Sequence, residues 1–254
     1  MQFVQFQFRL FMPRFYVSQP LAPGATVDLP EEVAHHLHVV RQQAGAALTL
    51  FNGEGGQYRA TLAEIGKRRA SAQVESFEDI EAEAPYPVTL AQGLPEGSKM
   101  DWIVEKAVEL GVAAVQPLAA QRSVVRLSGE RAEKRQAHWQ GVIVAASEQS
   151  GRNRLARLHP LADVQPWLAS PDAGAGPRIL LSPRATQSLA AWAKASPPQA
   201  VTLLVGPEGG FTPQEEEAAA AAGALPLSMG PRVLRTETAG LAALAILAGA
   251  WGAI

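Results

Sequence analysis

The stretch LVGPEGGF at residues 204–211 is an apolar run that ends in a glycine-rich turn. MGPRVLRTETA at 229–239 is a second turn with a glycine, and it also follows the end of an apolar run. The first loop carries a carboxylate, Glu208, and the second carries two arginines, Arg232 and Arg235. Open α/β sheets bind small molecules beyond the carboxyl ends of their strands. We therefore expect the two loops to line a small-molecule pocket. The alternative is that both are only tight turns that cap helices.

The chain beyond residue 87 alternates between short apolar runs and segments of helical periodicity. We expect strands at 88–92, 113–118, 178–182, 201–206 and 225–229, and helices at 99–110, 130–149, 186–194, 213–222 and 238–251. This alternation predicts a largely parallel sheet covered by helices, with SPR at 182–184 at the same edge as the two loops. The last helix is apolar nearly all round but shorter than a membrane span of ~20 residues. We expect it in the core or in a subunit interface, and we expect no membrane partner.

Capping patterns mark several helix boundaries. Ser98 and Asp101 resemble a capping box for the helix at 99–110, and Gly111 is a natural stop for it. Thr212 and Glu215 predict a second capping box at the next glycine loop.

Residues 15–77 show a different pattern, in which one helix interrupts a series of short alternating strands. We expect strands at 15–17, 25–29, 47–51, 58–65 and 70–77. NGEGG at 52–56 is a strong hairpin signal. The helix is expected to begin at Pro30 and to stop at Gly45. Several short strands with one helix indicate a small β-barrel.

Length and composition fit two globular domains. The chain has 254 residues, of which 47% are hydrophobic. An acidic, proline-containing segment at 78–87 predicts a linker between a domain at 1–80 and a second at 85–254. The first eleven residues alternate like a strand and lack the features of a signal peptide. Because MPRF at 12–15 offers a second initiation point, residues 1–11 are a candidate start-site extension.

The composition excludes several kinds of chemistry. Without cysteine there is no disulfide, thiolate nucleophile or Cys-ligated metal, which suits a reducing cytoplasm. His35, His36 and His38 share a helix, but no pair has the i, i+4 spacing of two metal ligands, so we expect no metal. Neither a Ser-His-Asp pattern nor a phosphate-binding glycine loop is present. With a net charge of −2, affinity for nucleic acid depends on local basic patches.

The motifs together resemble the RsmE family of ribosomal RNA uridine-N3 methyltransferases in the SPOUT superfamily. Both glycine loops match, and so, in the same order, do MPRF at 12–15, residues 35–41, VEKAVELGV at 104–112, QRS at 121–123 and SEQSGRNR at 147–154. The resemblance implies an α/β fold with an N-terminal PUA-like β-barrel and a C-terminal SPOUT α/β domain that contains a deep trefoil knot. It also implies a cytoplasmic homodimer that transfers a methyl group from S-adenosylmethionine to N3 of a uridine in 16S ribosomal RNA of the small subunit, at the 1498 site.

The resemblance also assigns roles to residues. It implies that S-adenosylmethionine contacts Leu181, Ser182, Gly206, Pro207, Glu208, Gly209, Met229, Gly230, Val233, Leu234 and Thr238. Methyl transfer needs the uridine nitrogen held in line and freed of its proton. Arg232 or Arg235 is expected to stabilise the resulting anion. Glu208 either acts as the base or fixes the cofactor loop.

Basic residues at the matching motif positions are expected to contact RNA: Arg14, Arg41, Lys106, Arg122, Arg152 and Arg154. The alternative is that they form ion pairs, as Lys106 would with Glu109 one helical turn away. Two other functions fit the same sequence. One is methylation of a transfer RNA, and the other is a non-catalytic RNA-binding module, which would have no use for the two glycine loops.

Overall fold

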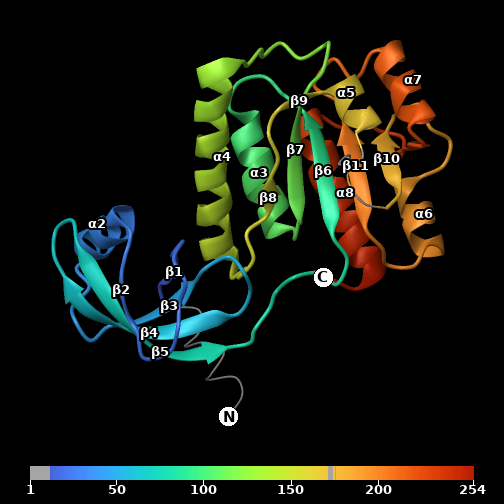
Figure 1. Ribbon diagram of the computed structural model, residues 1–254. Helices are drawn as coiled ribbons and strands as arrows, with labels where there is room; N and C mark the ends of the chain where they lie inside the picture. Colours follow the sequence, from blue (N-terminus) through green and yellow to red (C-terminus); the bar gives the residue numbers. More distant parts are fainter. Residues whose placement is uncertain (1–11, 171–173, 175) are drawn as a thin grey trace. The chain divides into compact units, whose positions relative to one another are not determined.

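The computed structural model describes residues 12–170, 174 and 176–254 (Figure 1) and divides into two compact units. The first unit runs to Glu83 and also contains Ser147–Leu155, while the second consists of Ala84–Ala146 and Ala156–Ile254. The sequence predicted a single domain boundary between residues 80 and 85. It did not predict that Ser147–Leu155 belongs to the first unit, because no pattern in the sequence indicates this. The strand expected within the first eleven residues lies outside the described residues.

The first unit is built on a five-stranded sheet in the order β1-β3-β4-β5-β2. Its strands are β1 (Arg14–Tyr16), β2 (Thr26–Asp28), β3 (Ala47–Phe51), β4 (Gln57–Ile65) and β5 (Ala70–Glu78). β1 runs parallel to β3 and the other pairs are antiparallel, so the hairpin expected at 52–56 is confirmed. Among the described strands no pairing joins the edge strands β1 and β2.

Helix α2 (Glu31–Val39) packs against β4 and β5 and contributes to this unit's core. Its Leu37 is fully buried with Leu48, Leu50 and Leu62 from the sheet. The expectation that α2 continues to Gly45 is wrong. The helix ends earlier because Arg41 takes a left-handed conformation, with φ at 57°, which ends the helical path.

The second unit contains a parallel sheet in the order β12-β10-β11-β6-β7-β8, with β9 also paired to β7. The strands are β6 (Val88–Gly93), β7 (Ala114–Ala119), β8 (Arg157–Leu158), β9 (Ala162–Asp163), β10 (Arg178–Leu181), β11 (Val201–Val205) and β12 (Leu225–Leu227). Every pairing is parallel, which confirms the prediction from the strand–helix alternation. The sequence analysis missed β8 and β9, because two residues are too few to show a period.

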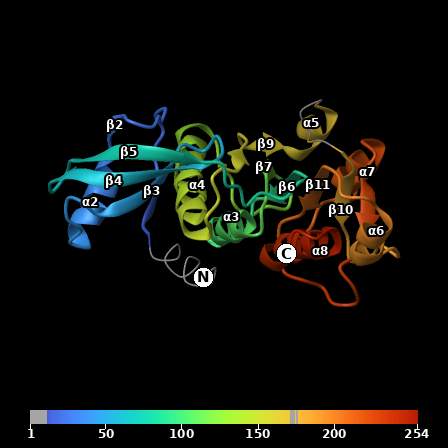
Figure 2. The ribbon, with the colours of Figure 1, turned by 90° about the horizontal axis from the view of Figure 1, so that it is seen from below.

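Helices cover both faces of this sheet, which makes three layers (Figure 2). They are α3 (Lys99–Glu109), α4 (Gly129–Ser150), α5 (Val164–Ala169), α6 (Leu189–Ala195), α7 (Pro213–Ala221) and α8 (Thr236–Trp251). α3 and α6 pack against α8 on one face, and α5 packs against α7 on the other. Leu241, Leu244 and Leu247 of α8 are buried, so the expectation that this helix lies in the core is confirmed. None of the described helices combines the length and apolar character that a membrane crossing requires.

The helix ends agree with two of the three capping predictions. Gly111 follows the end of α3 with φ at +81°, and Thr212 and Glu215 form the expected capping box of α7. The capping box at Ser98 and Asp101 is wrong, because no side-chain bond caps α3. Asp101 instead accepts a hydrogen bond from Trp139 Nε1 of α4 at 2.9 Å.

We expect Thr212→Ala to lower the free energy of unfolding of the second unit by about 1 kcal/mol, since it removes an N-cap hydroxyl that accepts from the Glu215 amide. Urea unfolding followed by tryptophan fluorescence measures this, because all five tryptophans lie in that unit. Ser98→Ala is the matched control, since Ser98 precedes a helix without making a cap bond. An equal loss in both variants would contradict the capping assignment.

Candidate active site

The candidate site lies where the strand order of the second unit reverses. From the central strand β6 the chain moves outward through β7 in one direction, and β11, β10 and β12 lie in the other direction. Ligands of open α/β sheets bind at such a switch point, beyond the carboxyl ends of the strands. Gly93 ends β6 there and lies close to Pro207, which follows β11. A β-carbon on Gly93 would lie 2.6 Å from Pro207 Cδ and 2.8 Å from its backbone nitrogen.

The loops after β10, β11 and β12 enclose a cavity of about 520 Å³, a size typical of small-molecule sites. Most residues expected to hold the donor line it: Leu181, Ser182, Gly206, Pro207, Glu208, Gly209, Met229, Val233 and Leu234. All three residues expected to be catalytic, Glu208, Arg232 and Arg235, line it too. Gly230 and Thr238 are not among its lining residues.

Several lining residues escaped the sequence analysis, among them Lys99, Thr236, Glu216 and Glu237. Lys99 belongs to α3, and only the three-dimensional packing brings this helix to the loop after β11. Glu237 stands inside the RTETA motif, so the motif itself was a signal for it. Arg184, also a lining residue, lies in the SPR turn that was expected at this edge.

The Glu208 side chain joins its own loop to α3 and to the residues before that helix. Its Oε1 accepts hydrogen bonds from Lys99 Nζ at 2.5 Å and from the Glu96 amide at 3.0 Å. Burial acts to raise the pKa of Glu208, but the bonds from Lys99 and from the backbone amides of Glu208 and Glu96 outweigh it and hold the pKa below its ordinary value. Because Oε1 of Glu208 already accepts from two donors, the arrangement favours the loop-fixing role over the role of base.

The same loop is held from its other side by Arg122. Nη1 of this arginine donates to the carbonyl oxygens of Gly209 at 3.0 Å and of Phe211 at 3.2 Å. Arg122, which was expected to contact RNA, is one of the residues that line the cavity. The guanidinium groups of Arg232 and Arg235 make no hydrogen bond or ion pair with any described residue, and both residues are exposed.

A buried chain of hydrogen bonds joins three elements below the cavity. Gln92 of β6 is fully buried, and its Nε2 donates to Thr236 Oγ1 at 2.8 Å. Thr236, the first residue of α8, donates in turn to the Gly206 carbonyl oxygen at 2.6 Å. The end of β6, the loop after β11 and the start of α8 are therefore fixed to one another, as a preformed site requires.

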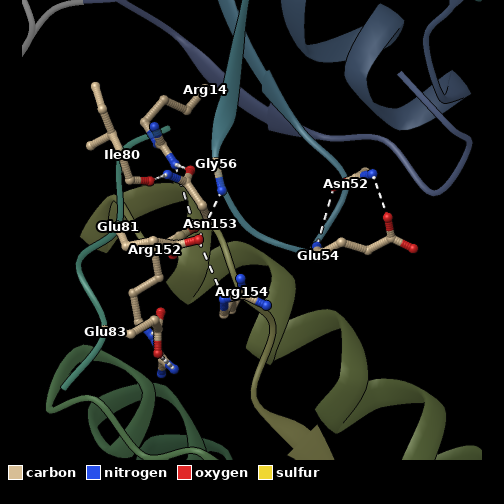
Figure 3. A network of polar contacts seen from close by, with 10 residues as sticks. All are labelled: Arg14, Asn52, Glu54, Gly56, Ile80, Glu81, Glu83, Arg152, Asn153 and Arg154. Atoms are coloured by element: carbon tan, nitrogen blue, oxygen red, sulfur yellow. Dashed lines mark hydrogen bonds and ion pairs between the residues drawn. The ribbon is translucent and has the colours of Figure 1, made fainter. Parts of the chain in front are cut away.

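The first unit holds a second group of predicted residues in a network of polar contacts (Figure 3). Arg14 donates to Gln57 Oε1 at 2.6 Å and to Asn153 Oδ1 at 2.7 Å. Arg152 is 3% exposed and donates from Nε to Glu83 Oε1 at 2.8 Å. These contacts anchor the 147–155 segment to the sheet. The positions of Arg14 and Arg152 favour the ion-pair and structural alternative over RNA contact.

The other basic residues differ in exposure and in partners. Arg154 lies 3.3 Å from Glu81 but keeps a side chain that is 55% exposed, and Arg41 is exposed. Lys106 pairs at 2.7 Å with Glu109, as the ion-pair alternative predicted, and also with Glu105. No group of three or more potential metal ligands occurs within the described ranges of the chain.

Glu148 gives the first unit an expected pH dependence. Its Oε1 accepts from the Tyr16 amide at 2.9 Å, and burial raises the pKa of this carboxyl despite that bond and the nearby His36 and Arg14. A raised pKa stabilises the fold below the ordinary value of about 4.3, and this contribution is lost as pH rises through the folded-state pKa. Glu148→Gln keeps an amide oxygen for Tyr16 and should remove that loss. Hydrogen exchange across β3–β5 between mildly acidic and neutral pH measures it, and an unchanged pH profile in the variant would contradict it.

Two family models match this chain. One, described as an RNA methyltransferase domain, covers residues 82–248, and the other, described as an RNA methyltransferase PUA domain, covers residues 29–75. The first includes every residue that lines the cavity.

Named relatives match over nearly the whole chain. Ribosomal RNA small subunit methyltransferase E of Bacillus subtilis is 31% identical, across 93% of this chain and 96% of its own. The Synechocystis protein of the same name is 36% identical, across 91% and 76%. A crystal structure of the Neisseria gonorrhoeae enzyme bound to S-adenosylmethionine is 38% identical, with a TM-score of 0.86 over 94% of this chain and 98% of that one. A Legionella pneumophila methyltransferase in complex with S-adenosylmethionine is 32% identical, with a TM-score of 0.88 over the same shares. The chain therefore belongs to the RNA methyltransferase family that includes ribosomal RNA small subunit methyltransferase E.

Proposed function

We propose that this protein transfers a methyl group from S-adenosylmethionine to N3 of a uridine in 16S ribosomal RNA, at the 1498 site. The observation that carries the proposal is the cavity at the switch point, which brings together a held glycine loop and two arginines that pair with no described residue. The Neisseria relative that contains S-adenosylmethionine matches 94% of this chain.

The residues that line the cavity fit S-adenosylmethionine. Leu181, Met229 and Leu234 offer apolar surface suited to an adenine ring, and the backbone of the loop after β11 offers polar groups for the rest of the molecule. When bound, the sulfonium supplies an electrophilic methyl group. Lys99 and Arg122 keep the loop in place by holding Glu208 and the carbonyls of 209 and 211.

The chain's own contribution to the chemistry is positioning and charge. A uridine that loses its N3 proton becomes an anion with charge spread over its ring oxygens. Arg232 and Arg235 line the cavity and have no partner among the residues that the structure describes, so either guanidinium is available to stabilise that anion. Oxyanion donors of this kind each contribute about 10²–10³-fold in rate. The exposed Arg41 and Arg154 are the basic residues we retain as RNA contacts.

We further propose that the first unit closes as a PUA-like barrel, that the second contains the trefoil knot, and that the protein acts as a homodimer in the cytoplasm. Family membership supports all of these. Val233 at the cavity is 81% exposed and Trp102 on α3 is 47% exposed, so the second unit presents apolar side chains that a second copy would cover. Sedimentation of the purified chain tests the dimer.

Mass mapping of methylated nucleotides tests the proposed reaction. In 16S RNA from a strain that lacks this gene, the N3-methyluridine present in the parent strain should be absent, and the purified protein with S-adenosylmethionine should restore it. If the deletion leaves every N3-methyluridine of 16S RNA in place, the proposal fails. A mark lost from a transfer RNA instead would identify the other class of substrate.

A further inference from the structure

Three carboxylates line the cavity, and two of them already have partners. Glu208 accepts from Lys99 and from a backbone amide, and Glu216 accepts a charged hydrogen bond from Arg184. The third, Glu237, has a buried Oε2 with no hydrogen-bond partner in the described part of the chain. A carboxylate oxygen that is shielded from water and lacks a donor is costly to maintain, which points to a role in function.

Glu237 also lies at the cavity, on a turn of helix that hydrogen bonds hold in place. It is in the first turn of α8. The preceding residue, Thr236, is bonded to Gln92 and to the Gly206 carbonyl, so the start of the helix cannot drift from the cavity. The side chain is therefore carried on a fixed support, with one oxygen that no described donor occupies.

We propose that Glu237 is the catalytic base that takes the N3 proton from the target uridine. The inference rests on the proposed function and names the residue that performs its proton transfer. The N3–H bond breaks and its proton moves to a Glu237 carboxylate oxygen. The electron pair left on N3 forms the new N–CH₃ bond, while the S–CH₃ bond of S-adenosylmethionine breaks and its electron pair stays on sulfur. Glu237 then releases the proton to solvent.

The charged residues that line the cavity with Glu237 are Lys99, Arg122, Arg184, Arg232 and Arg235, together with Glu208 and Glu216. Lys99 of α3 interacts electrostatically with it, and Arg232 and Arg235 lie on the loop that leads into α8. Glu208, on the loop after β11, is neutralised by Lys99. Glu237 therefore faces a largely cationic surface, which also suits the uridine anion once the proton has left.

Steady-state methylation of small ribosomal subunits from a strain that lacks the gene tests the assignment. Glu237→Gln should lower kcat by about 10²–10⁴-fold, the usual contribution of a general base. Its affinity for S-adenosylmethionine, measured by calorimetry, and its thermal midpoint should stay at the wild-type values. Glu217→Gln is the matched control, since Glu217 is exposed on α7 and does not line the cavity. Glu208→Gln should chiefly weaken binding of S-adenosylmethionine, because it loosens the loop.

The pH profile and a modified substrate separate a base from a merely structural residue. The wild-type rate should level off once the base is ionised, whereas the rate of Glu237→Gln should keep rising with pH as the uridine ionises unaided. RNA with 5-fluorouridine at the target should recover much of the loss, because fluorine makes N3–H more acidic. Glu237→Asp keeps a carboxylate and should retain the plateau with a lower kcat.

Three results would overturn the assignment of Glu237 as the catalytic base. A Glu237→Gln variant that keeps the wild-type kcat, or that loses affinity for S-adenosylmethionine while keeping the wild-type pH profile, would overturn it. So would a loss of kcat that 5-fluorouridine does not reduce. If the wild-type protein forms no N3-methyluridine, the proposed function itself fails. A failure of the proposed function can be told apart from a failure of the Glu237 assignment, because the wild-type reaction is measured first and the variants are compared with it.

Discussion

Replacing Arg152 with alanine should destabilise the first unit by about 3–5 kcal/mol, the usual effect of removing one partner of a buried ion pair. Arg152 is 3% exposed, and Glu83, its partner at 2.8 Å, would be left without the guanidinium. Loss of the Arg152 guanidinium should also release the 147–155 segment from the sheet. The neighbouring Asn153 donates to the Ile80 carbonyl oxygen and accepts from Arg14, and these bonds should weaken with it. Hydrogen exchange across β3–β5 measures the effect, since the first unit contains no tryptophan.

Arg154→Ala is the matched control for this prediction. Its guanidinium is 3.3 Å from Glu81 but 55% exposed, and exposed pairs contribute only about 0–1 kcal/mol. It should therefore leave hydrogen exchange nearly unchanged while lowering affinity for RNA. A double variant, Arg152→Leu with Glu83→Leu, should recover part of the stability, since no unpaired charge remains. If Arg152→Ala weakens RNA binding with no change in hydrogen exchange, Arg152 is an RNA contact after all and the structural assignment is wrong.

The second unit was predictable from its sequence to a large extent, because its signals are local. Short apolar runs separated by helical periodicity indicate a parallel sheet by themselves, and the residues where those runs end are the loops that line the cavity. Glu208, Arg232 and Arg235 could be named in this way before any contact was known. The capping box at Thr212 is local as well, since both partners lie within one turn.

Contacts between distant segments could not be predicted. Nothing in SEQSGRNR indicates that it contacts β1 and residues 80–83, because an ion pair between residues 69 positions apart leaves no periodic pattern. The failed capping box at Ser98 has the same origin. The sequence pattern pairs Asp101 with Ser98, but in the structure Trp139 of α4 donates a hydrogen bond to Asp101 Oδ1. The role of Glu208 was open for the same reason, since it depends on a hydrogen bond from Lys99 of α3, and Glu237 was not singled out at all.

Gly93→Ala should have a large effect on the site itself. The new β-carbon would lie 2.6 Å from Pro207 Cδ and 2.8 Å from Pro207 N, and neither atom can turn away as a long side chain could. We expect a destabilisation near the upper end of the usual range of about 1–3 kcal/mol for an overpacked site. Because Pro207 precedes Glu208, relief of the clash must move the loop, and affinity for S-adenosylmethionine should fall well beyond what the loss of stability explains.

Gly141→Ala distinguishes this steric effect from a general intolerance of glycine replacement. Gly141 is exposed within α4, and a β-carbon there would meet nothing within 4 Å, so this variant should gain about 0.5–1 kcal/mol from helix propensity. Urea unfolding followed by tryptophan fluorescence gives the stability of both variants, and calorimetry gives their affinities for S-adenosylmethionine. If Gly93→Ala binds S-adenosylmethionine as the wild type does, the approach of β6 to Pro207 does not shape the cavity, and the loop after β11 is positioned by its contacts with Lys99, Arg122 and Thr236.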